Sequence, residues 1–216
     1  MKKFLLINLS PRKEGTSVTL LNTCKQYLDD KGLATDAAHL YPSLKDPSAL
    51  FDAIAQADTL VFSGPCYINT YPADTVWLLQ ELAARPELLH GQQVYGMIQG
   101  GMPTAHTHAS GLSMLELFCN QCGLQYKGGF VMGLGAMLNG QPLSKLFNAK
   151  AVIRQLNVFF AHIEKGEVSP PAVYESSLLK WSGFKYWLMC RMINRLMDKD
   201  LASRGIDIHQ PSPYLK

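Results

Sequence analysis

Apolar runs of strand length alternate with segments of helical periodicity along most of the chain. The predicted strands are 3–9, 33–40, 58–64, 92–99 and 126–132. The predicted helices are one that opens at Thr16–Ser17 and others at 47–57, 72–84, 110–123 and 144–165. Strands that alternate with helices form a mostly parallel sheet covered on both faces. We therefore expect a doubly wound α/β domain with strand order 2-1-3-4-5, whose ligand crevice lies where strands one and three diverge.

A polar loop follows the first strand and opens the first helix, with the sequence Ser10-Pro11-Arg12-Lys13-Glu14-Gly15-Thr16-Ser17. The free N–H groups and the dipole of a helix N-terminus favour an anion there. The hydroxyls of Ser10, Thr16 and Ser17 are neutral donors, and the Arg12 guanidinium matches phosphate oxygens. The loop has neither the nucleotide-triphosphate nor the dinucleotide glycine pattern. It therefore predicts a site for a terminal monophosphate, with an ordinary N-capped helix as the alternative interpretation.

Two further loops follow the strands that border the expected crevice. The loop after the third strand reads Pro65-Cys66-Tyr67-Ile68-Asn69-Thr70-Tyr71-Pro72, and the loop after the fourth runs from Gly100-Gly101 to His108. Aromatic side chains beside proline-held backbone are suited to lining a flat ring, and glycines permit close backbone approach. These loops predict that a ring system binds beside the phosphate site.

The three loops together carry a resemblance that covers residues 3–165. The Ser10-Pro-Arg12 loop, the Pro65-x-Tyr67 sequence and the Gly100-Gly101 turn occur in the order and at the strand ends typical of the flavodoxin-like, NAD(P)H-dependent FMN reductases. The resemblance implies a flavodoxin-like fold and non-covalently bound FMN. The residues that it implies for cofactor binding are Ser10, Arg12, Thr16, Ser17, Pro65, Cys66, Tyr67, Ile68, Gly100 and Gly101. No separate catalytic residue is expected, because the hydride chemistry belongs to the flavin.

The implied activity is transfer of electrons from NADH or NADPH to a small acceptor such as a quinone, a flavin, or a nitro or azo compound. The alternative is a flavodoxin-type electron carrier without turnover of its own, and a third class is a flavin-free regulatory domain. Carriers of that type are typically acidic, whereas this chain has a pI near 8.5. This charge favours an enzyme. The helix at 72–84 lacks the Lys and the Asp-Arg pair that many family members carry. Any pyridine-nucleotide or dimer contact that those charges make in relatives is therefore not assigned to this chain.

Composition narrows the class of protein further. The net charge of +3 is too small to indicate a nucleic-acid partner. No apolar run approaches the ~20 residues that span a bilayer, and no leader with a cleavage site is visible. Five cysteines do not form an even disulfide framework. We therefore expect a soluble, reduced, cytoplasmic protein without an integral membrane segment.

Two pairs of residues are candidates for a metal or redox site. His106 and His108 lack a companion carboxylate or cysteine at metal-ligand spacing. They remain either flavin neighbours or solvated loop residues. Cys119 and Cys122 have the spacing of a redox motif, but they lie near a helix end where the dipole disfavours thiolate. We expect these cysteines to pack in the core and expect no metal site.

The C-terminal part forms an extension after Ser169-Pro170-Pro171, so we expect an FMN-binding domain at 1–168 and a helical extension at 169–216. The segment 176–204 is predicted as one helix that is apolar nearly all round, with Trp181 and Trp187 among its large side chains. So much apolar area should be covered. The alternatives are packing on the chain's own domain and packing on a second subunit. We expect an intersubunit role in a homodimer or homotetramer, with Trp181 or Trp187 covering a partner's flavin as a further possibility. Membrane attachment is disfavoured because basic and apolar faces are poorly separated.

Overall fold

The structure is a computed structural model that describes residues 2–179 and 182–207. The chain divides into two compact units, Met1–Leu179 and Lys180–Lys216. The first unit carries the sheet and all the predicted cofactor-binding residues, and the second carries one long helix. Each unit is described by itself.

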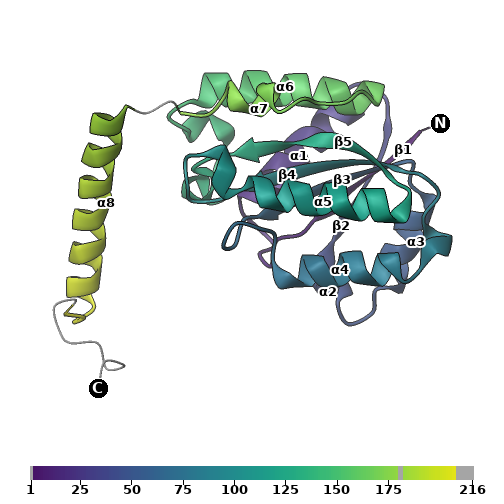
Figure 1. Cartoon of the computed structure of the whole chain (residues 1–216), viewed down its shortest axis with the longest axis horizontal. Helices are drawn as coiled ribbons and strands as arrows, with labels where there is room; N and C mark the ends of the chain where they lie inside the picture. The colour runs from purple at the N-terminus through teal and green to yellow at the C-terminus, as the bar shows by residue number, and fades with distance from the viewer. Residues whose placement is uncertain (1, 180–181, 208–216) are drawn as a thin grey trace. The chain divides into compact units, whose positions relative to one another are not determined.

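In the described part of the first unit, one parallel sheet has the order β2-β1-β3-β4-β5, as Figure 1 shows. The strands are β1 (Lys3–Asn8), β2 (Ala34–His39), β3 (Thr59–Pro65), β4 (Gln93–Gln99) and β5 (Gln125–Met132). The predicted fold class and strand order are confirmed. Parallel pairing brings the carboxyl ends of β1, β3 and β4 to one edge of the sheet.

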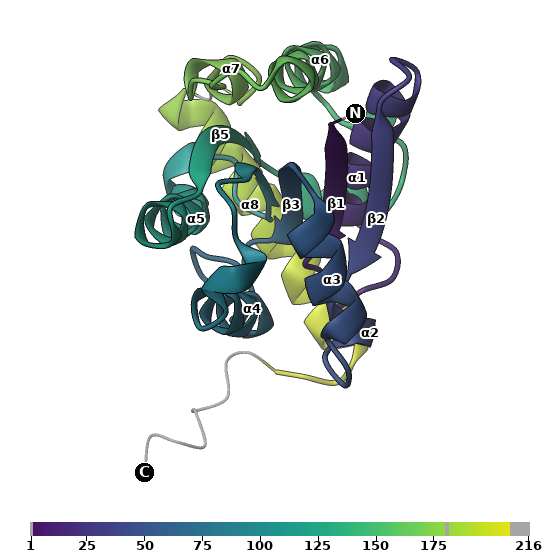
Figure 2. The same cartoon turned by 90° about the vertical axis from the view of Figure 1, so that its right-hand side faces the viewer.

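Helices cover both faces of this sheet. Helices α1 and α6 lie side by side on one face, and α3, α4 and α5 lie across the other (Figure 2). The bounds are α1 (Thr16–Asp29), α2 (Leu40–Ser43), α3 (Ser48–Gln56), α4 (Ala73–Ala83), α5 (Ala109–Cys122), α6 (Ala149–Lys165) and α7 (Ala172–Glu175). Short 3-10 turns are η1 (Pro86–Leu88), η2 (Ala105–Thr107), η3 (Gly135–Leu138) and η4 (Leu143–Lys145).

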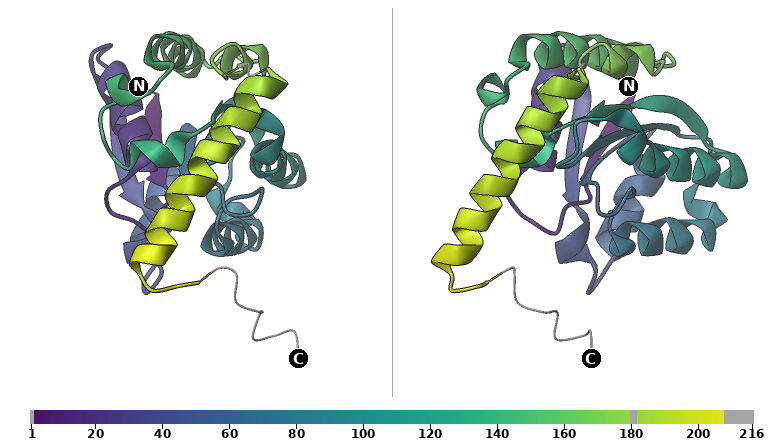
Figure 3. Two further views of the ribbon diagram at one scale, coloured as in Figure 1. Left: turned by 90° about the vertical axis from the view of Figure 1, so that its left-hand side faces the viewer. Right: turned by 60° about the vertical axis from the view of Figure 1, so that its left-hand side comes forward.

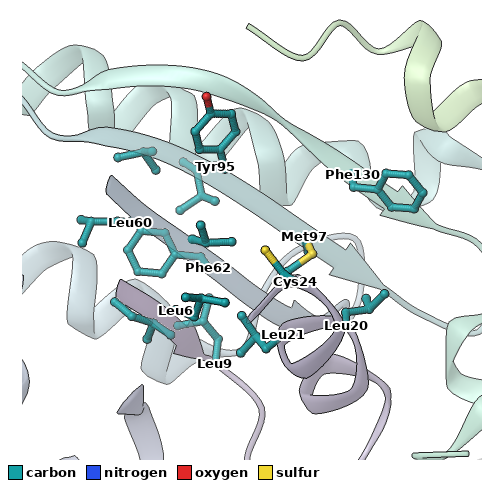
Figure 4. Packing of buried hydrophobic residues seen from close by; sticks show 14 of the residues in the cluster. Leu6, Leu9, Leu20, Leu21, Cys24, Leu60, Phe62, Tyr95, Met97 and Phe130 are labelled. Carbon is teal, nitrogen blue, oxygen red and sulfur yellow. The ribbon is translucent and has the colours of Figure 1, made fainter. Parts of the chain in front are cut away.

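The core lies on both sides of the central strands. Every residue of β3 is buried, which explains why its sequence is a continuous apolar run instead of an alternating one. Met97 of β4 points toward Leu20 and Cys24 of α1 (Figure 4). On the other face, α5 packs so closely on the sheet that a Cβ added at Gly96 would meet Leu115 at 2.7 Å. Packing on both faces therefore holds the central strands in place, and the candidate site is built at their carboxyl ends.

The first unit extends past residue 168, where the sequence indicated a domain end. The Ser169 N–H donates to the Lys127 carbonyl at 2.7 Å, which places Ser169 beside the edge strand β5. Gly128 permits this approach, since it has a φ of +103° and an added Cβ would lie 2.2 Å from the Ser169 oxygen. Tyr174 of α7 then packs against Phe130 with ring centroids 6.5 Å apart. The residues that follow Ser169 are thus held to the sheet as far as Leu179.

Two predicted helices have different bounds in the structure. The helix expected at 144–165 begins at Ala149, because Leu146 is extended and η4 is a separate turn. The helix expected at 176–204 is shorter. It is α8 (Gly183–Ser203), capped by Ser182, whose side chain accepts from the Lys185 N–H. Figure 3 shows α8 as one uninterrupted helix. Trp181 lies outside the described residues.

Helix α8 has no buried side chain. It is also the longest helix described, at 21 residues. Within residues 2–179 and 182–207, no helix combines the length and the hydropathy that crossing a bilayer requires.

Candidate functional site

A cavity opens at the carboxyl ends of β1, β3 and β4, where the three predicted loops meet. Its lining residues are Ser10, Arg12, Gly15, Thr16, Pro65, Cys66, Tyr67, Gln99, Gly100, Gly101, Ala136 and Asn139. All the predicted cofactor-binding residues except Ser17 and Ile68 are among them. The sequence analysis missed Gly15, Gln99, Ala136 and Asn139.

The first loop is held in shape by its own side chains. The Ser10 N–H donates to Asn8 Oδ1 at 2.9 Å, and the Arg12 N–H donates to Ser10 Oγ at 3.1 Å. His39 Nε2 lies 2.7 Å from the Ser10 carbonyl oxygen. A carbonyl only accepts, so His39 carries its proton on Nε2. Since Ser10 Oγ accepts within the loop, its own proton is free to be donated toward the cavity.

Helix α1 presents its N-terminus to the same cavity. Its N-cap residue is Gly15, which has no side chain, and no side chain caps the helix. The first-turn N–H groups therefore have no side-chain acceptor, and the positive end of the dipole faces the cavity beside Arg12. A helix start of this kind next to a guanidinium is suited to a phosphate.

A fourth loop, residues 133–148 between β5 and α6, is hydrogen-bonded to the first. The Thr16 hydroxyl donates to the Gly135 carbonyl at 2.8 Å in a buried hydrogen bond. Arg12 Nη1 donates to Asn139 Oδ1 at 3.1 Å near the surface. The glycines at 133, 135 and 140 are the sequence signal that could have identified this loop, since they mark a tight path after a strand.

The second and third loops form the other end of the cavity. The Cys66 N–H donates to the Gln99 carbonyl at 2.6 Å, and the Cys66 thiol donates to the Thr107 carbonyl at 3.3 Å. Gly100 has no room for a side chain, since an added Cβ would lie 2.5 Å from His108 Nε2. Tyr67 is half exposed at the rim. This end of the cavity therefore presents backbone without side chains at the glycines, and one aromatic ring, to a ligand.

Burial favours the neutral forms of Cys66 and His108 at this end of the cavity. It raises the pKa of the Cys66 thiol above its usual value and lowers the pKa of His108. His108 Nδ1 lies 3.0 Å from the Thr104 carbonyl oxygen, so its proton is on Nδ1 and Nε2 is left as an acceptor behind Gly100. His106 is exposed. The structure therefore separates two histidines that the sequence analysis treated as a pair.

Ser17 and Ile68 do not reach the cavity. Ser17 is buried behind it, where its Oγ accepts from Gln99 Nε2 at 3.3 Å and its carbonyl accepts from Ser63. Ile68 is 96% exposed. The Tyr67 N–H donates to the Thr70 carbonyl at 2.7 Å, and this tight turn gives Ile68 a φ of +50° and directs it outward. Ile68 therefore does not line the cavity in this structure, and its contact with a bound ring stays a prediction.

Gln99 is the most informative residue that the sequence analysis missed. It ends β4, is one of the residues that line the cavity, and is 6% exposed. Its amide nitrogen donates to Ser17, but its Oε1 is buried without a hydrogen-bond partner. An unpaired buried oxygen costs about 1–3 kcal/mol. A ligand hydroxyl that reached this atom would remove that cost.

The other candidate ligands are His106, His108, Cys119 and Cys122. The described residues contain no group of three or more His, Cys, Asp or Glu side chains arranged for a metal. Cys119 is buried in α5 and Cys122 is half-buried, and both are free thiols. Burial raises the pKa of Cys119 to about 12, which disfavours the reactive thiolate. The packing interpretation of these cysteines is therefore supported.

No family model matches the chain. A search of curated proteins also finds no match. Solved structures do match. An apo NADH:FMN oxidoreductase is 19% identical with a TM-score of 0.60, over 81% of this chain and 94% of that one. A general stress protein 14 from Treponema denticola, solved in complex with FMN, is 16% identical with a TM-score of 0.53, over 77% and 99%.

A flavodoxin from Streptococcus pneumoniae is 14% identical with a TM-score of 0.56, over 76% of this chain and 99% of that one. The matched structures thus include both an NADH:FMN oxidoreductase and a flavodoxin. At these identities the likeness shows a shared fold, which is the flavodoxin-like fold that the sequence motifs indicated.

Proposed function

We propose that the cavity binds FMN and that the protein is an NAD(P)H-dependent FMN oxidoreductase. The observation that carries the proposal is the cavity itself. The loops that the sequence predicts for a monophosphate and for a flat ring converge on one hollow, and the lining of that hollow includes Gln99, whose Oε1 has no hydrogen-bond partner.

The phosphate end fits a dianion. Arg12 supplies a forked cation, Ser10 supplies a hydroxyl, and the uncapped start of α1 supplies N–H groups, while the Thr16 hydroxyl is already donated to Gly135. Asn139 already holds Arg12 from the fourth loop at 3.1 Å. Because this hydrogen bond already restricts the Arg12 side chain, Arg12 loses less conformational freedom when a phosphate binds.

The middle of the cavity fits a polyhydroxylated chain. Gln99 Oε1 needs a donor, and a ribityl hydroxyl is a donor of the right kind at the right place between the phosphate and ring ends. The ring end offers Tyr67 for contact with a flat π-system. It also offers the backbone of Gly100 and Gly101, which can approach the polar edge of a ring.

When bound, FMN supplies the hydride and electron chemistry. The chain's own residues bind and orient it, and the ring end keeps neutral groups around it because burial raises the pKa of Cys66 and lowers that of His108. Our proposed electron donor is NADH or NADPH, and the proposed acceptor is a small molecule such as a quinone, a flavin or an azo compound. The likeness to an NADH:FMN oxidoreductase supports this proposal.

The second candidate function is electron carriage without turnover, which the likeness to a flavodoxin favours. Anaerobic mixing of the FMN-loaded protein with NADH or NADPH separates the two. A reductase loses the yellow flavin absorbance on mixing and regains it when a quinone is added. A carrier stays yellow until a partner reductase is supplied. Free FMN in the same buffer is the control for direct reduction in solution.

A further inference from the structure

A second cavity lies in the first unit, at the edge strand β5, which passes between α5 and α7 (Figures 1 and 2). Its volume is about 390 Å³, which is within the range of small-molecule sites. One face of α5, the first half of β5 and the residues 168–174 line it. None of its lining residues also lines the proposed FMN cavity, so the two cavities are separate.

A bulge in β5 shapes this second cavity. Lys127 and Gly128 of β5 together stand opposite the single residue Tyr95 of β4. The extra residue of a bulge moves the side chains before it to the opposite face of the strand. Tyr126 and Gly129 are three positions apart, yet both line the cavity beside α5. The bulge therefore brings Tyr126 to the cavity, where strict alternation would direct it to the other face of the sheet.

Ser169 lines the same cavity and has an unused hydrogen-bonding group. Its backbone N–H donates to the Lys127 carbonyl at 2.7 Å, which holds the residue at the bulge. Ser169 is 2% exposed, and its Oγ has no hydrogen-bond partner. A buried polar atom without a partner is unfavourable and uncommon. A donor on a bound ligand would satisfy this oxygen.

The charges around the cavity favour a cation. Glu116 of α5 is an exposed lining residue, and it forms no ion pair with any residue in 2–179 or 182–207. Tyr126 and Tyr174 add two phenol rings to the lining. Burial, and after it the nearby Glu116 carboxylate, raises the pKa of the Tyr126 hydroxyl. A carboxylate and aromatic rings in one cavity both attract a cation.

We propose that this cavity binds a small primary amine that carries an aromatic or apolar body. The ammonium donates to Ser169 Oγ, and the Glu116 carboxylate balances its charge. An ammonium has three donors and no acceptor, and the carboxylate and hydroxyl oxygens of the lining can all accept. The body packs against the apolar part of the lining, which includes Leu112, Val168 and Pro170. The proposal goes beyond the proposed function.

Other classes of ligand fit this cavity less well. No lining residue is Lys, Arg or His, so an anion would lie near Glu116 without a cation to pair with. A purely apolar molecule would leave Ser169 Oγ without a partner. An amine with an apolar body satisfies both parts of the lining.

The test is calorimetric titration of the full chain with phenethylamine and tryptamine, and with phenethyl alcohol and tryptophol as their hydroxyl counterparts. We expect each amine to bind about fivefold or more tightly than its alcohol, the scale of an ion pair near the surface. Glu116→Gln should remove that preference and leave the affinity for the alcohols unchanged. Glu87→Gln is the matched control, because Glu87 is exposed and does not line the cavity.

Ser169→Ala tests the hydrogen bond to the ligand. The variant removes an oxygen that has no partner, so the stability measured by urea unfolding should not fall. The affinity for both amines should fall about fivefold or more, the scale of one hydrogen bond to a charged group. Ser110→Ala, at an exposed serine of α5 that does not line the cavity, is the control.

Three outcomes would overturn the proposal. The first is failure of both amines to bind at millimolar concentration. The second is equal affinity for amines and alcohols, or amine binding that Glu116→Gln leaves unchanged. The third is displacement of the amines by FMN, which would place them in the other cavity. The titrations without FMN do not require a flavin, so this proposal and the proposed function can fail separately.

Discussion

The hydroxyl of Thr16 donates to the carbonyl of Gly135 at 2.8 Å, in a buried hydrogen bond between residues that are 119 positions apart. Thr16 opens α1, and Gly135 opens the turn η3 after β5. This contact ties the loop predicted to hold a phosphate to a loop that the sequence analysis did not single out. The candidate site is therefore built from four loops, and its rigidity depends on a bond between the first and the fourth.

Thr16→Val should destabilise the protein. The substitution keeps the shape of the side chain but removes the donor, and it leaves the Gly135 oxygen buried without a partner, which costs about 1–3 kcal/mol. Urea unfolding measures the loss. Thr23→Val is the matched control on the same helix, because its hydroxyl donates only to the Thr19 carbonyl. Equal stability of the Thr16 variant and the parent would contradict the role given to this bond.

Arg12→Ala should weaken FMN binding by about 1.5–3 kcal/mol, the scale of a hydrogen bond to a charged group. Riboflavin lacks the phosphate, so its affinity should hardly change. Fluorescence titration with both flavins measures the difference, and Lys13→Ala is the control for loss of one positive charge from the same loop. If Arg12→Ala lowers the affinity for both flavins equally, Arg12 supports the loop without contacting phosphate.

Gln99→Leu should weaken FMN and riboflavin alike, by about 1 kcal/mol, because both carry the ribityl chain that we assign to Oε1. Lumichrome, which lacks that chain, should bind unchanged. The stability of the unliganded protein should change little, since the variant removes the unpaired Oε1 together with the hydrogen bond from Nε2 to Ser17, and the two effects oppose one another. Gln125→Leu, at the opposite end of the sheet, is the control. A loss of affinity for FMN alone, with the affinity for riboflavin unchanged, would indicate that Gln99 acts on the phosphate and not on the ribityl chain.

Cys66 should react slowly with iodoacetamide at neutral pH. Burial raises its pKa, so the thiolate fraction at pH 7 is smaller than that of a free thiol, and the rate should keep rising with pH beyond the usual thiol range. Peptide mapping by mass spectrometry measures labelling at each cysteine. Saturating FMN should protect Cys66, which lines the cavity, and leave Cys122 of α5 unprotected. Protection of both residues, or of neither, would contradict this placement.

The sequence predicted the strands and three of the four loops because those features are local, and the sheet order followed from the alternation of strands and helices. Strand-length apolar runs, a polar loop before a helix, and glycines after a strand each carry their signal within a few residues. The hydroxyl of Thr16 and the guanidinium of Arg12 were found in this way. Ser17 was assigned to the site by the same local pattern, but its hydroxyl accepts from Gln99 behind the cavity.

The features that the sequence did not predict depend on contacts between distant parts of the chain. Gln99 resembles any polar residue at a strand end, and only burial without a partner for Oε1 makes it notable. Asn139 acquires its role from Arg12, which lies 127 positions away. The outward direction of Ile68 depends on a turn with positive φ, and Ile is an uncommon residue in that conformation.

The central claim is that the cavity holds FMN with its phosphate at the start of α1. The most direct measurement is titration of the purified, flavin-free protein into FMN and into riboflavin, followed by desalting and absorbance. We predict quenching of FMN fluorescence to an equimolar endpoint, flavin absorbance that survives desalting, and at least about tenfold weaker binding of riboflavin, the equivalent of 1.4 kcal/mol. A protein that neither quenches FMN fluorescence nor retains flavin absorbance would contradict the account.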